Sequence, residues 1–166
     1  MSQSDNKYAK YLVLPEHKII LCYFEGQIQI QDIISINSQL ISDPLYTPDC
    51  DVLMDFRNCE ALVFRIEILE FVNFFKKNIK VKGKVKSGII INSMNAEFLF
   101  NTYKSFINLF NVEAQRFHDL DSCLLWFRPK ENDFTEIKEA LVSIKPKKPT
   151  RPEFLINPCV TFVTPH

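Results

Sequence analysis

The sequence predicts an α/β protein in which helices cover a mixed, mostly parallel β-sheet, followed by a C-terminal extension. Three observations predict this class: short apolar runs that alternate with helical stripes, a first pair of strand-like runs with no helix between them, and a proline-rich end. The predicted order is β-β-α-β-α-β-α-β-α. Strands joined through helices run parallel by right-handed crossovers, whereas the first strand folds back antiparallel on the second.

The first two strands are predicted from two apolar runs, "YLVLP" and "KIILCYFEG", at residues 11–15 and 18–26. Only the polar stretch Pro15-Glu16-His17 interrupts them, which suits a hairpin. Isoleucines and a leucine at helical spacing then predict a helix over residues 30–42. Asp43-Pro44 ends that helix, because a proline disfavours helical backbone in the residue before it.

The rest of this part of the chain repeats a strand-then-helix pattern. The continuous apolar run "SGIIINS" is typical of a central parallel strand, and Asp119 is placed to cap the last helix. The predicted elements are the strand 51–56, the helix 65–79, the strand 87–93, the helix 95–110, the strand 112–118 and the helix 119–127.

The composition changes beyond Phe127, where six of the nine prolines lie. We therefore predict an α/β domain over residues 1–127 and a proline-rich extension over residues 128–166. Within the extension, "FTEIKEALVSI" (134–144) makes a short amphipathic helix. The later run "FLINPCVTFV" is apolar enough to need a docking site, on its own domain or on a partner.

Composition and charge argue against several functions. Twenty basic residues balance twenty acidic ones, which disfavours non-specific nucleic-acid binding as the main task. No apolar run approaches the length of a signal core or a membrane span, so we predict a cytoplasmic protein without stable membrane insertion. The five cysteines form no CxxC pair and the three histidines have no ligand-like spacing. We predict no metal and no cofactor.

Four segments, in matching order and spacing, resemble a known family: "IILCYFEGQIQIQDI", "DVLMDFRN", "KVKSGIIINS" and "FHDLDSCLLWF". Residues 8–127 resemble the small bacterial STAS-like domains, which are related to anti-sigma-factor antagonists and compared in fold with the lipid-carrying CRAL-TRIO lobe. The resemblance implies a STAS-like sandwich and a non-enzymatic module for protein interaction or regulation. The alternative that it implies is a small protein that binds an apolar, lipid-like ligand.

The sequence departs from this family where a phosphorylation switch would lie. Antagonists of the family carry a phosphorylatable serine, a second serine and a glycine at the start of the helix after the third strand. Here "NCEALVFRIEIL" has no Ser, Thr or Gly between Asn58 and Phe71. Such a switch needs a hydroxyl to accept the phosphate, so we expect a module that lacks the phosphorylation switch. The apolar residues 62–64 either pack at the helix entry or line a pocket or contact surface.

An acidic residue and a basic residue stand two positions apart at the predicted end of the third strand. Asp55 and Arg57 share one face of that strand, at the carboxyl end where open α/β sheets bind ligands. The other interpretation is that they pair with each other, or with backbone N–H groups of a neighbouring loop, and hold the strand end. No GxSxG, P-loop or GxGxxG motif occurs. We therefore predict no enzyme and no catalytic residue.

Fifteen phenylalanines suggest a second contact surface. The helix 65–79 is apolar on more than one face, whereas covering a sheet needs a single stripe. The surplus suggests a homodimer, contact with the C-terminal tail, or an apolar ligand between the helices and the sheet. The candidate residues for binding a ligand or an unknown protein partner are Asp55, Arg57, Phe64, Arg65, Phe71, Phe74, Asn92 and Ser93.

The run "KKNIKVKGKVK", residues 76–86, contains six lysines and no acid. Its first lysines suit the carboxyl end of a helix, and the others solvate the following loop. The alternative is docking to an anionic partner or membrane surface.

Overall fold

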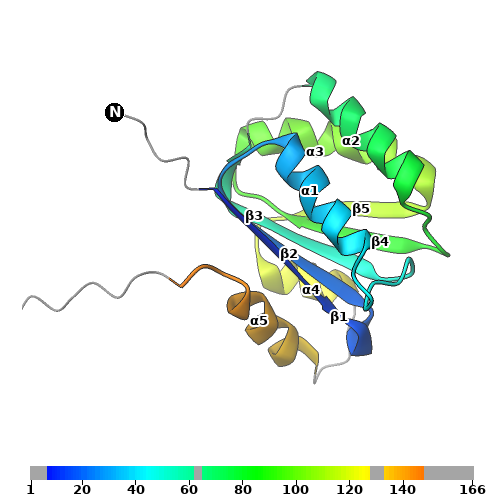
Figure 1. Cartoon of the computed structure of the whole chain (residues 1–166). Coiled ribbons are helices and arrows are strands. Elements are labelled where there is room, and N and C mark those ends of the chain that lie inside the picture. Colours follow the sequence, from blue (N-terminus) through cyan, green and yellow to red (C-terminus); the bar gives the residue numbers. More distant parts are fainter. Residues whose placement is uncertain (1–6, 62–64, 128–132, 148–166) are drawn as a thin grey trace, which may run out of the picture.

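Five strands form one mixed sheet in the computed structural model, which describes residues 7–61, 65–127 and 133–147 (Figure 1). The strand order in the sheet is the order in the sequence, with β1 antiparallel to β2 and every other neighbouring pair parallel. The strands are β1 (Tyr8–Leu14), β2 (Ile19–Ile28), β3 (Asp51–Ala61), β4 (Val85–Ile90) and β5 (Val112–Phe117). The predicted α/β class and mixed sheet are confirmed.

Helices cover both faces of the sheet (Figure 1). One face carries α1, α2 and α3, and the other carries α4 and α5. The helices are α1 (Ile30–Ile41), α2 (Arg65–Asn78), α3 (Met94–Ile107), α4 (Leu120–Phe127) and α5 (Asp133–Ser143). Two short 3-10 turns, η1 (Pro15–His17) and η2 (Asn108–Phe110), precede β2 and β5.

The β1–β2 hairpin turns at the polar interruption that predicts it. Leu14 pairs with Ile19, and the chain reverses through η1 and Lys18, which adopts a left-handed backbone with φ 49°. The predicted cap of the last helix of the domain is also confirmed, because the Asp119 carboxylate accepts a 2.8 Å hydrogen bond from the backbone N–H of Ser122.

The third strand is longer than the prediction of residues 51–56. After an irregularity in the pairing of β2 with β3, the two strands continue side by side from Glu25 opposite Asn58 to Ile28 opposite Ala61. One extra residue on β3 there is the signature of a β-bulge. The prediction ended this strand too early, because the polar residues that follow Phe56 break the apolar run although their backbone remains paired.

A glycine allows α4 to lie close to β4, which lies between β3 and β5. A Cβ atom on Gly88 would stand 2.6 Å from the Cys123 sulfur and 2.8 Å from the Phe127 ring. We expect Gly88→Ala to lower the free energy of unfolding by about 1–3 kcal/mol in urea denaturation, because α4 must move away. In a chain that already carries Cys123→Ala, Gly88→Ala should cost less stability than it does in the native chain, because the sulfur that the new Cβ would meet is gone. An alanine at residue 88 that leaves stability unchanged would contradict this close approach.

The predicted amphipathic helix 134–144 is observed as α5, which packs on the sheet. Its residues Ile137 and Leu141, with Ile144 just after it, are buried in a cluster that includes Leu21 and Leu53. The Tyr8 hydroxyl donates a 2.8 Å hydrogen bond to the Ile144 carbonyl. The domain boundary at residue 127 stays a prediction, and the apolar run 154–163 lies outside the described residues.

Candidate functional site

Asp55 and Arg57 form a closed ion pair on the face of the sheet that α5 covers. The Arg57 side chain donates two hydrogen bonds to the carboxylate, from Nε to Oδ1 at 2.9 Å and from Nη2 to Oδ2 at 2.7 Å. The Arg57 backbone N–H donates a third, at 3.2 Å. Asp55 is fully buried, whereas the Arg57 side chain is 27% exposed. The two side chains pair with each other, as one of the two interpretations predicts, but they do so within β3 and not at its end, because the strand continues to Ala61.

A polar cluster surrounds this pair and joins three elements. Lys145, which follows α5, places its ammonium 3.6 Å from Asp55 Oδ2 and 5.1 Å from the centre of the Tyr23 ring. The Tyr23 hydroxyl donates a 2.6 Å hydrogen bond to Glu25 and accepts one of 2.9 Å from Asn58. The cluster thus fastens the chain after α5 to β2 and β3.

The protonation states of this cluster are fixed at neutral pH. Desolvation would raise the pKa of the Asp55 carboxyl, but the hydrogen bonds and charge of Arg57, aided by Lys145, hold this pKa below its ordinary value. Burial, together with the hydrogen bond to Glu25, raises the pKa of Tyr23 to about 12. Asp55 is therefore ionised and Tyr23 neutral near pH 7, and neither is poised for proton transfer.

Buried cysteines and dispersed acids offer little reactive chemistry in the described part of the chain. Burial raises the thiol pKa of Cys22, Cys59 and Cys123 to about 12, which suppresses the nucleophilic thiolate. Within the described ranges, no three His, Cys, Asp or Glu side chains gather closely enough to hold a metal ion.

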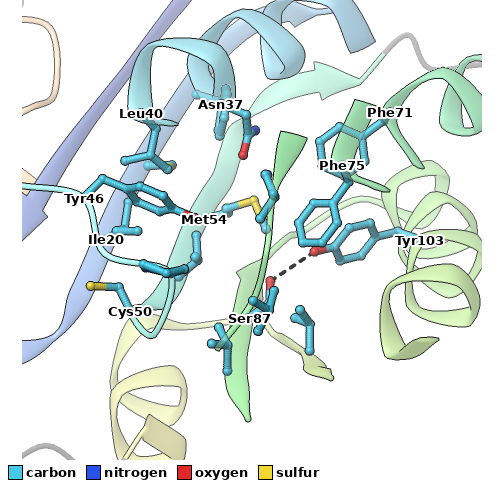
Figure 2. Close-up of a pocket in the computed structure, with 18 residues that line it drawn as sticks. Ile20, Asn37, Leu40, Tyr46, Cys50, Met54, Phe71, Phe75, Ser87 and Tyr103 are labelled. Atoms are coloured by element: carbon cyan, nitrogen blue, oxygen red, sulfur yellow. Dashed lines mark hydrogen bonds between the residues drawn. The ribbon is translucent and has the colours of Figure 1, made fainter. Parts of the chain in front are cut away.

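An apolar cavity lies on the other face of the sheet, beneath α1, α2 and α3 (Figure 2). Figure 2 shows Phe71, Phe75 and Tyr103 on one side of it and Leu40 and Tyr46 on the other. Its volume is about 60 Å³. Pockets that take drug-sized ligands span roughly 300–1,000 Å³, so this one admits only a few small atoms or waters.

One polar contact marks the floor of the cavity. The hydroxyls of Ser87 on β4 and Tyr103 on α3 lie 3.4 Å apart. Burial raises the pKa of Tyr103 to about 12 although the Ser87 hydrogen bond lowers it, so the phenol stays neutral. The cavity can orient a small polar group but supplies no charge.

The structure separates the candidate residues onto different surfaces. Asp55 and Arg57 lie together, whereas Phe71 is buried on the opposite face of the sheet and lines the cavity. Phe74 is half-buried on α2, and its role as a binding residue stays a prediction. Asn92 and Ser93 are exposed just after β4.

Two of the predicted binding residues have no described side chain. Phe64 lies outside the described residues, as does the whole apolar loop 62–64. Arg65 begins α2, but its side chain is outside the described part of the structure.

The sequence prediction missed Lys145 and Tyr23. Tyr23 could have been found from the alternation along its strand, which places it on the same face as Leu21. No local signal could have found Lys145, because its contact with Asp55 depends on α5 folding back over the sheet.

Comparison with solved structures identifies the class of fold. The chain is similar to the crystal structure of an uncharacterised protein of the DUF3478 family, with a SpoIIAA-like fold, from Shewanella loihica PV-4. The TM-score is 0.50 at 15% sequence identity, and the match covers 76% of this chain and 99% of that one. The protein therefore has a SpoIIAA-like fold, as the resemblance to STAS-like domains predicts.

A second similar structure is an anti-sigma factor antagonist from Mycobacterium paratuberculosis. Its TM-score is 0.44 at 14% identity, with 77% of this chain and 99% of that chain covered. No protein-family model matches the sequence, and no curated protein matches it either.

Proposed function

We propose that this protein is a non-enzymatic interaction module that binds a protein partner at the carboxyl edge of its sheet. The observation that carries the proposal is the closed Asp55–Arg57 pair: the buried Asp55, which lies in the middle of β3 opposite the last residue of β4, is held by three hydrogen bonds from Arg57. A general acid or base needs a group whose pKa lies near the working pH. The pKa of Asp55 is lowered instead, which takes it further from neutral pH. The edge is suited to recognition instead of proton transfer.

The rim of this edge supports partner binding. Asn92 and Ser93 follow β4, His118 and Asp119 follow β5, and all four are exposed. A 3.0 Å backbone hydrogen bond from Ile91 to Phe117 holds the two loops together. Open α/β sheets bind their ligands outside the carboxyl ends of parallel strands.

Arg57 supplies a positive charge close to this rim, near enough to interact with Asp119. A guanidinium has five N–H donors, and the Asp55 carboxylate takes two of them. Because the Arg57 side chain is 27% exposed, the other donors can reach a carbonyl or carboxylate of a partner. We propose that the module works without a phosphoserine, since the sequence from Asn58 to Phe71 offers no hydroxyl of Ser or Thr.

A photo-crosslinking amino acid tests the partner-binding edge. With this residue at Asn92 or at His118, illumination in cells of the source organism should give the same discrete protein adduct. With it at Glu139, which is exposed on α5, the adduct should be absent. Equal labelling from all three positions, or from none, would contradict the proposed edge.

Binding of a small apolar ligand is the second candidate, and the cavity beneath α1, α2 and α3 favours it. Its volume of about 60 Å³ is too small for a lipid unless the helices separate. Native mass spectrometry of the purified protein distinguishes the candidates and also reports a homodimer. A mass equal to the chain or its dimer supports the interaction module, whereas a co-purifying apolar molecule lost on denaturation supports the second candidate.

A further inference from the structure

Three loops meet at the amino edge of the sheet, opposite the proposed partner edge. We call this surface the amino edge and define it by residues 42–50 before β3, by the last residues of α2 with the loop that follows them (76–84) before β4, and by η2 with Asn111 (108–111) before β5. A 3.0 Å backbone hydrogen bond from Lys82 to Pro48 joins the first two loops, and one of 3.2 Å from Val85 to Asn111 joins the last two. Figure 1 shows the connections from α2 into β4 and from α3 into β5 at this side.

The amino edge carries four lysines that form no ion pair with any described acidic side chain. Lys76, Lys77, Lys80 and Lys82 are exposed, and none of them forms an ion pair within the described part of the chain. The fifth lysine of this stretch, Lys84, pairs with Glu113 at 2.8 Å.

The acids of the first loop are already engaged. Asp49 pairs with Lys18 at 2.8 Å, and this contact lowers the Asp49 pKa to about 2. Asp43 accepts hydrogen bonds from the Tyr11 hydroxyl at 3.0 Å and from the Leu45 backbone N–H at 2.8 Å. Lys18 therefore neutralises Asp49, whereas Asp43 keeps its charge among neutral donors and is outnumbered by the four lysines of residues 76–82.

The backbone presents these lysines in a fixed direction. Ile79 and Val81 line the cavity, whereas Lys80 and Lys82, which alternate with them, are exposed. Packing of the two apolar side chains therefore sets the orientation of the two basic ones. Less conformational entropy remains to be lost when this surface binds.

Exposed leucines accompany the lysines on the same edge. Leu109 is 77% exposed and Leu45 is 53% exposed. A single exposed leucine is ordinary, but these two flank a basic surface. Apolar side chains beside basic ones fit the interface of an anionic bilayer, where lysines meet lipid headgroups and leucines enter the acyl boundary.

We propose that the amino edge docks on an anionic membrane surface, with Lys76, Lys77, Lys80 and Lys82 on the headgroups and Leu45 and Leu109 inserted. An acidic peptide or a nucleic acid would match the lysines but leave the two leucines without apolar contact. The binding is peripheral: within the described residues no helix has the length and hydrophobicity to traverse a bilayer. The carboxyl edge, which lies at the other end of the strands, stays accessible to a partner.

Co-sedimentation of the full chain with vesicles tests this proposal. The protein should sediment with phosphatidylcholine vesicles that contain phosphatidylserine, not with pure phosphatidylcholine vesicles, and added salt should release it. Each lysine near the surface adds about fivefold in affinity, so Lys80→Gln with Lys82→Gln should weaken binding on the order of 20-fold. Lys10→Gln with Lys147→Gln removes the same charge from exposed positions off this edge and should have little effect.

The leucines give a second, independent variant. Leu45→Ser with Leu109→Ser should weaken vesicle binding while its salt dependence is retained, and circular dichroism should show an unchanged fold because both side chains are exposed. The proposal is overturned if the two lysine pairs lose affinity equally, if both vesicle types bind alike or not at all, or if the leucine variant binds as the native chain does. Binding of a polyuridine RNA with the same dependence on Lys80 and Lys82, in place of vesicles, would also overturn it.

Discussion

A chain that ends at Phe127 is expected to lose on the order of 5 kcal/mol in free energy of unfolding, or to fail to fold. The truncation removes Ile137, Leu141 and Ile144, which are buried against β2 and α4. Burying one large aliphatic side chain stabilises a protein by about 1.5–3 kcal/mol. The truncated protein should unfold at lower urea concentration and bind a hydrophobic dye, because the sheet face around Leu21 and Leu53 becomes exposed.

A chain that ends at Lys147 is the control for this truncation, because it keeps α5 and removes only residues 148–166. Leu141→Ala in the full chain offers a milder version, with an expected loss of about 2–5 kcal/mol. If the chain that ends at Phe127 keeps the native urea midpoint and binds no dye, α5 does not stabilise the sheet. If the chain that ends at Lys147 is destabilised to the same extent, the effect belongs to residues 148–166.

Replacing Arg57 by leucine should have the second largest effect, with a loss of about 3–5 kcal/mol at neutral pH. The substitution leaves the fully buried Asp55 carboxylate with Lys145, at 3.6 Å, as its remaining cation. Lys145→Gln should cost less than Arg57→Leu, because Lys145 makes the longer contact and its side chain is 30% exposed. Urea denaturation at several pH values measures both effects.

The pH dependence of the Arg57 variant should have the opposite sign to that of the native chain. The pKa of Asp55 in the native fold is lowered, so this group stabilises the fold above its unfolded pKa of about 3.9 and loses that contribution as pH falls. Without Arg57, desolvation raises the Asp55 pKa, and protonation of the carboxyl on acidification relieves the unpaired charge. The difference in stability between the two proteins should therefore be largest near pH 7 and shrink towards about pH 4.

A double variant separates the ion pair from simple loss of packing. Asp55→Leu with Arg57→Leu removes both charges, and it should be more stable at neutral pH than Arg57→Leu alone. A constant difference between Arg57→Leu and the native chain across the pH range would mean that the Asp55 charge does not cause the loss.

The element order and the cover of helices on a mixed sheet could be predicted from sequence because periodicity is local. The stripe with Ile137 and Leu141 predicts α5, and the three polar residues at Pro15 predict the hairpin. The end of β3 could not be predicted in the same way. Its last residues remain in the sheet because they pair with β2 beyond a bulge, and that pairing has no trace in their own pattern.

Only those contacts of the candidate site that join residues close together in the sequence could be predicted. Asp55 and Arg57 lie two apart on one strand, so their pairing follows from strand geometry. The contacts of Lys145 with Asp55 and of Ser87 with Tyr103 depend on how helices return to the sheet. Crossover geometry of that kind is set by packing of the whole core, which a local pattern does not encode.

The hydrogen bond from Tyr8 to the Ile144 carbonyl joins positions 136 residues apart, and it bears on how the chain folds as it is made. The first strand meets its last partner only when nearly all of the described chain has been synthesised. Contacts so distant in sequence slow folding and leave apolar surface exposed for longer. On the ribosome, the part of this sheet face that Ile137, Leu141 and Ile144 cover must therefore stay exposed until the end of the described chain is made.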